Sequence, residues 1–99
     1  MTLVDIIQSD ESVAIKIAEH LIKNKFALKV HIDTNKLISE NEVHNCVRVY
    51  FISKSLLFDE INKEINEKFF TEDLEIYGTP VTNMSQHLGK QLRTFLQLT

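Results

Sequence analysis

The pattern of apolar and polar positions along the chain predicts strands that alternate with helices. Short apolar or strictly alternating runs are typical of strands, whereas apolar residues recurring every three to four positions are typical of one buried helical face. The strands are expected at 3–7, 26–33, 46–53 and 74–79, and the apolar helical faces at 13–22, 57–69 and 88–96. Right-handed crossovers then give an α+β fold, a ferredoxin-like β-α-β-β-α-β sandwich with an extra C-terminal helix.

The second and third strands are expected to pair as a hairpin. Residues 34–45 between them are mostly polar and non-periodic, which predicts a loop or, alternatively, a longer hairpin arm. One register places all the apolar positions of the two strands on the face that the helices cover. Its pairs are Leu28–Phe51, Val30–Val49 and Ile32–Val47 on that face, with Lys29–Tyr50, His31–Arg48 and Asp33–Cys46 on the other.

The face that the helices leave bare mixes aromatic, aliphatic and charged side chains. Asp5 and the fourth-strand residues Glu75, Tyr77 and Thr79 are expected to join it. Three interpretations compete: a solvated sheet, a surface that packs on another subunit, and a surface that binds a ligand or nucleic acid. Tyrosine and arginine are enriched at protein interfaces, which favours the subunit contact.

Composition and charge narrow the classes of function. The chain has 99 residues, 43% of them hydrophobic and 25% charged, which fits one globular domain spanning residues 1–99. A net charge of −3 and a pI of about 5.7 argue against nucleic acid as a partner. A single cysteine excludes an internal disulfide and any CxxC site.

Targeting signals are not apparent in the sequence. The first residues lack a basic stretch followed by an apolar one, and no run approaches the ~18 apolar residues of a membrane span. We therefore expect a cytoplasmic protein without membrane contact. No nucleophile elbow, HExxH or Walker A pattern occurs, so we do not expect an enzyme.

Several segments together resemble the CutA divalent-cation tolerance family over nearly the whole chain. The family's opening turn into its first helix is similar to 9–18, its second strand to 26–32, its third strand to 46–55 and its fourth strand to 74–81. The resemblance implies the ferredoxin-like fold, the PII-like architecture and a homotrimer, with a role in divalent metal tolerance.

This chain departs from the family pattern at three places. The family's cysteine in the second strand falls at Lys29, its H-P-Y-E segment falls on 69–72 and keeps only Glu72, and its Trp-containing arm is replaced by 34–45. Binding of copper or another divalent cation by this chain is therefore a hypothesis.

The candidate metal ligands lie along the predicted hairpin. His44 and Cys46 share one face if this stretch is extended, and the expected register brings His31 and Asp33 near them. Imidazole, thiolate and carboxylate groups suit copper or zinc. The alternative is an exposed loop histidine beside an ordinary strand cysteine.

A further set of residues is expected at subunit contacts or at the cleft between subunits. The predicted cleft residues are Lys29, Arg48, Tyr50, Glu72, Glu75 and Tyr77. The acids near the fourth strand are interpreted either as proton-transfer groups or as solvated side chains.

The alternative function is a PII-like regulatory trimer that senses a small anionic metabolite through Lys29 and Arg48.

Overall fold

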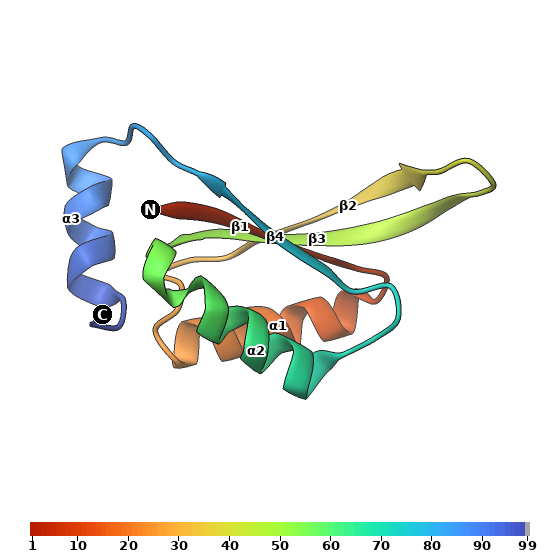
Figure 1. Ribbon diagram of the computed structural model, residues 1–99, viewed down its shortest axis with the longest axis horizontal. Helices are drawn as coiled ribbons and strands as arrows, with labels where there is room; N and C mark the ends of the chain where they lie inside the picture. Colours follow the sequence, from red (N-terminus) through yellow and green to blue (C-terminus); the bar gives the residue numbers. More distant parts are fainter. Residues whose placement is uncertain (99) are drawn as a thin grey trace.

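The computed structural model describes residues 1–98 and contains one sheet with helices packed against it (Figure 1). Helices α1 and α2 lie side by side on one face, whereas α3 stands at the end of the sheet opposite the β2–β3 hairpin tip. The elements are β1 (Thr2–Gln8), α1 (Glu11–Lys23), β2 (His31–Ile38), β3 (Val43–Ser53), the 3₁₀ turn η1 (Ser55–Leu57), α2 (Phe58–Phe69), β4 (Glu75–Pro80) and α3 (Gln86–Phe95).

The four strands form a sheet in the order β2-β3-β1-β4, and all neighbours are antiparallel. Each helical crossover therefore skips one strand: β1 and β2 flank β3, and β3 and β4 flank β1. This topology confirms the predicted α+β, ferredoxin-like sandwich with an extra C-terminal helix. Among residues 1–98, no helix has the length and apolar run that crossing a membrane would need.

The core lies between the sheet and the pair α1–α2. Even-numbered residues of β1 and odd-numbered residues of β3 point toward the helices, as the alternation predicts. The helices contribute residues spaced three and four apart, which form one stripe each. The fully buried core includes Val4, Ile6, Ala14, Ile17, Leu21, Phe26, Val49, Phe51, Ile61 and Ile65.

Local signals fix where two of the helices begin. The Asp10 carboxylate accepts from the backbone N–H groups of Ser12 and Val13, which lack partners within α1. The hydroxyl and backbone of Ser12 lower the pKa of Asp10, together with the Val13 N–H, so the cap stays anionic. The Ser85 hydroxyl accepts from the N–H of Leu88 at the start of α3.

The second strand differs from the expectation in position. It begins at His31 instead of residue 26, and β3 begins at Val43 instead of residue 46. Only residues 39–42 form the loop, where the Ser39 N–H donates to the Glu42 carbonyl. The interpretation of 34–45 as a loop was wrong and the alternative, a long hairpin arm, is confirmed. Much of the arm extends beyond the helices (Figure 1), so apolar alternation is not required there.

The hairpin register also differs from the predicted one, by two residues. A shift of two keeps every side chain on its face, so the apolar pattern alone does not distinguish the two registers. The observed pairs on the bare face are His31–Tyr50, Asp33–Arg48 and Asn35–Cys46, and Ile32 pairs with Val49 toward the helices. The predicted pairs Lys29–Tyr50, His31–Arg48 and Asp33–Cys46 were therefore wrong.

We expect Ile61→Ala to lower the free energy of unfolding by about 3 kcal/mol, because the side chain is fully buried and its loss leaves a cavity. Leu56→Ala is the matched control. Leu56 is 81% exposed, so its truncation should change stability by no more than about 0.5 kcal/mol. Urea denaturation followed by circular dichroism measures both, and equal effects would contradict the described core.

Candidate functional site

The sheet face opposite α1 and α2 is the candidate functional surface. Its central strands contribute alternating charged, aromatic and aliphatic side chains, because every second residue of β1 and β3 points away from the core. Outer strands β2 and β4 add more polar groups. The surface, called the bare face below, comprises Leu3, Asp5, Ile7, His31, Asp33, Asn35, Cys46, Arg48, Tyr50, Ile52, Glu75, Tyr77 and Thr79.

An ion pair lies at the centre of the bare face. Arg48 Nε donates to Asp5 Oδ1 at 2.5 Å, and an Arg48 terminal nitrogen lies 3.9 Å from Asp33 Oδ2. Asp5 is only 3% exposed, which is unusual for a carboxylate on a sheet surface. The hydrogen bond to Asp5 raises the pKa of Arg48, so this charge is permanent. The pair joins β1 to β3 across the middle of the sheet.

An aromatic cluster adjoins the ion pair. The Arg48 guanidinium carbon lies 4.0 Å from the centroid of the Tyr50 ring, a cation–π contact. The His31 ring stacks on Tyr50 with centroids 5.0 Å apart and planes 17° from parallel. Three side chains from two strands thereby form a flat, partly apolar platform of the kind found at the centre of interfaces.

Helix α3 covers one end of the bare face. Leu88 and Leu92 face Leu3 and Ile52 across a hollow of about 150 Å³, whose rim includes Lys29, His31 and Tyr50. Gln97, which follows α3, holds this end in place by hydrogen bonds. Its N–H donates to the Lys25 carbonyl, its side-chain amide donates to the Asn24 carbonyl, and Lys54 Nζ donates to its carbonyl.

An acidic hollow of about 250 Å³ lies at the other end, between the hairpin arm and the connection from α2 to β4. It brings together four residues that the sequence analysis had assigned to separate sites: His44, Cys46, Glu72 and Glu75. The hydroxyls of Thr71 and Ser9 lower the pKa of Asp73 in this hollow, and the nearby His44 contributes. Other lining residues are Ile7, Gln8, Leu37, Ser39, Glu42 and Asp73.

The four predicted metal ligands do not converge within one chain. His31 stacks on Tyr50, and Asp33 faces Arg48. Cys46 is 5% exposed, and its thiol donates to Asn35 Oδ1 at 2.7 Å. No group of three or more His, Cys, Asp or Glu side chains in residues 1–98 is placed to hold a metal ion. The two-residue register shift explains this, because it moves Asp33 away from Cys46.

The six predicted cleft residues occupy four places on or beside the bare face. Lys29 and Tyr50 border the hollow under α3, Glu72 and Glu75 border the acidic hollow, and Arg48 lies between them. Tyr77 is 47% exposed on β4, where it pairs with Asp5. The six residues therefore do not line one common cleft within a single chain.

Sequence reasoning did not single out Gln8 or Glu42. Gln8 is buried at the acidic hollow, where its carbonyl oxygen accepts from the Asp10 N–H and its amide nitrogen has no partner in the described chain. The sequence does contain a sign of the role of Gln8, because a polar residue at an inward-facing position of β1 interrupts the apolar alternation. Glu42 had no signal, since the extent of the arm was unknown.

Solved structures give a consistent comparison for this fold. The chain matches no family model and no curated protein sequence. It superposes on CutA1 from Pyrococcus horikoshii with a TM-score of 0.88 at 18% identity, covering 99% of this chain and 100% of that one. The chain has the CutA1 fold.

Two further CutA1 structures agree. The divalent cation tolerance protein from Thermus thermophilus matches with a TM-score of 0.81 at 20% identity, covering 98% of this chain and 100% of that one. The Archaeoglobus fulgidus CutA, described as a periplasmic divalent cation tolerance protein, matches with a TM-score of 0.82 at 17% identity and the same coverage. The predicted resemblance to CutA is thus confirmed at the level of the fold.

We expect Arg48→Met to destabilise the CutA1 fold of this chain by about 3 kcal/mol, because it leaves the buried Asp5 carboxylate without its partner. The double variant Asp5→Leu with Arg48→Met should recover most of this loss, since no charge is then buried alone. Urea denaturation of both variants measures the difference. A double variant no more stable than the single one would show that the charge pair is not the source of the loss.

Proposed function

We propose that this chain is a divergent CutA-like protein that assembles as a homotrimer through its bare face and acts in the response to divalent metal ions. The observation that supports it is the bare face itself, which carries a half-buried ion pair and an aromatic platform but no covering helix over its middle. The metal response follows the divalent cation tolerance named for two of the similar structures. The trimer follows the family resemblance of the sequence.

The chemistry of the bare face favours a protein partner over water. Ile52, Tyr50 and Leu3 are partly buried already, and Tyr77 extends the apolar surface to the edge strand. Interfaces combine such aromatic and arginine side chains with aliphatic neighbours and few free charges at their centre. A second and third copy would exclude water from the Asp5–Arg48 pair and so strengthen it.

We expect the chain to show in light scattering a mass close to three times its 11.5 kDa. Tyr77→Lys should shift the mass toward one chain, because it places an unpaired charge on the bare face. Leu56→Lys is the matched control, since Leu56 is an exposed apolar residue outside the bare face. A wild-type mass of a single chain at micromolar concentration would overturn the trimer.

The acidic hollow supports the metal part of the proposal. His44 lies 3.7 Å from Glu42 there, and Glu72, Asp73 and Glu75 add negative charge around the same space. The donors among the described residues line the hollow without converging, and we treat the ion as the molecule to which the protein responds. Long, exposed glutamates can turn toward an ion that the imidazole has bound.

We expect calorimetry with Cu²⁺ to show saturable binding that His44→Ala weakens at least about tenfold, since even outer partners of a metal ligand are worth that much. His87→Ala is the matched control, because His87 is an exposed histidine on α3, away from the acidic hollow. If both variants bound Cu²⁺ equally weakly, the measured heat of binding would come from unspecific contact with histidines. This result would contradict a site at the acidic hollow.

The alternative PII-like sensing function fits the bare face less well. It requires Lys29 and Arg48 to attract an anion, but Arg48 is already neutralised by Asp5 and lies near Asp33.

The cytoplasmic location and the absence of enzymatic activity stay predictions. Fractionation of cells that express the chain tests the location, and a periplasmic pool would contradict it.

A further inference from the structure

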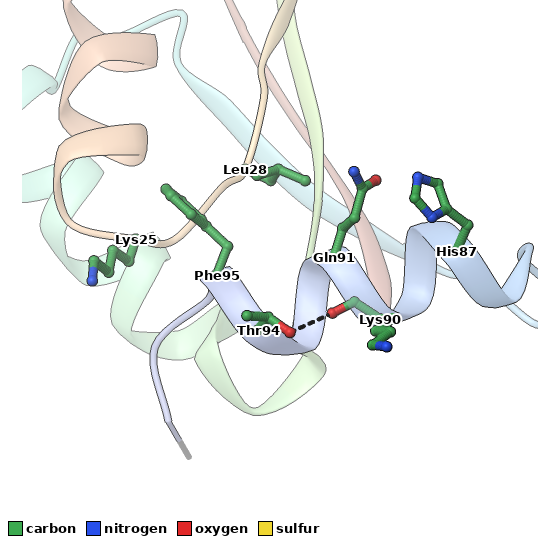
Figure 2. Close-up of a pocket in the computed structure, with 7 residues that line it drawn as sticks. All are labelled: Lys25, Leu28, His87, Lys90, Gln91, Thr94 and Phe95. Atoms are coloured by element: carbon green, nitrogen blue, oxygen red, sulfur yellow. Dashed lines mark hydrogen bonds between the residues drawn. The ribbon is translucent and has the colours of Figure 1, made fainter.

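A larger hollow lies away from both the centre of the bare face and the acidic hollow. It has a volume of about 540 Å³ and opens between α3 and the connection from α1 to β2. This volume is within the range of roughly 300–1,000 Å³ that small-molecule sites occupy. Figure 2 shows its lining residues, called the basic hollow below: Lys25, Leu28, His87, Lys90, Gln91, Thr94 and Phe95.

Helical spacing explains how α3 builds one wall. His87, Gln91 and Phe95 recur every fourth residue, and Lys90 and Thr94 form the adjacent row. Figure 2 shows the Phe95 ring reaching from α3 toward the α1–β2 connection, where Leu28 lies, so that the two apolar side chains form the inner part of the hollow. The polar side chains occupy the rim.

The charge of the basic hollow is opposite to that of the whole chain. Lys25, Lys90 and His87 line it, and no carboxylate of the described residues does, although the protein carries a net charge of −3. None of the ion pairs formed within residues 1–98 involves these three side chains. The charges of Lys25 and Lys90 are therefore available to an anion from solution.

The backbone that carries the basic hollow is held in one conformation. Lys25 adopts φ 59°, a left-handed geometry that non-glycine residues rarely take. Its N–H donates to the Ile22 carbonyl, and its carbonyl accepts from the Gln97 N–H that follows α3. Both walls are thus tied to each other, which reduces the ordering that a ligand must impose on binding.

We propose that the basic hollow binds a small organic anion, with a carboxylate, sulfonate or phosphate group on an apolar planar body. The positive charges of Lys25 and Lys90, which lie at opposite ends of the hollow in Figure 2, attract the anionic group, and the body packs against Phe95 and Leu28. The Thr94 hydroxyl donates to the Lys90 carbonyl, so its proton is not available to the anionic group. This proposal does not depend on the trimer or on metal binding.

The test uses the aromatic sulfonate 8-anilino-1-naphthalenesulfonate as the probe, titrated into the full chain and followed by fluorescence. We expect saturation at one probe per chain and at least a tenfold weaker affinity in the double variant Lys25→Glu with Lys90→Glu. The matched control is Lys63→Glu with Lys68→Glu, which changes the net charge equally on the exposed face of α2. The control should bind like the wild type.

Three results would overturn the proposal. They are equal weakening in the control, unchanged binding in the Lys25 and Lys90 variant, and equal affinity for the uncharged probe N-phenyl-1-naphthylamine. Near-ultraviolet circular dichroism of each variant, with amide resonances of residues 86–95 as a second readout, separates loss of the hollow from loss of folding. If light scattering gave the mass of a single chain while the probe still bound, the trimer would be contradicted and the proposed anion site at the basic hollow would not.

Discussion

The contact between Asp5 and Arg48 constrains most of what lies around it. It joins the two central strands on the side that α1 and α2 do not reach, and it buries a carboxylate there. A buried charge must keep its partner in place, which fixes the Arg48 side chain and with it the Tyr50 and His31 rings that pack beside it. The bare face is consequently a shaped surface and not a set of freely moving side chains.

The same contact limits what the surface can recognise. An arginine engaged by one carboxylate and lying near a second offers little to a free anion, whereas Lys25 and Lys90 at the basic hollow have no such partner in the described chain. Acidic side chains gather at the opposite end, near His44. Charges of opposite sign are thus held at separate places on a small molecule, and each place suits a different class of ligand.

The sequence was sufficient for the topology because each element has its own periodicity. Val4, Ile6, Val49 and Phe51 alternate, Ile17 and Leu21 repeat at helical spacing, and both patterns survive in the folded core. The hairpin arm was not predictable in the same way, since Thr34, Asn35 and Lys36 point into solvent and carry no apolar pattern. The register error has the same origin, because apolar patterning is unchanged by a shift of two residues. The same shift moves Asp33 away from Cys46, so the predicted metal ligands do not converge within residues 1–98.

The position of β1 has a consequence for how the chain folds during its synthesis. Of the four strands it is synthesised first, yet it pairs with β3 and β4, whose residues follow tens of positions later. Its apolar residues Val4 and Ile6 must wait for partners of high sequence separation, and such contacts form slowly. The β2–β3 hairpin joins residues that are close in sequence, so it can form first and offer β3 as an edge with which β1 pairs. Until then the unpaired apolar residues of β1 are exposed to chaperones or to another unfolded copy.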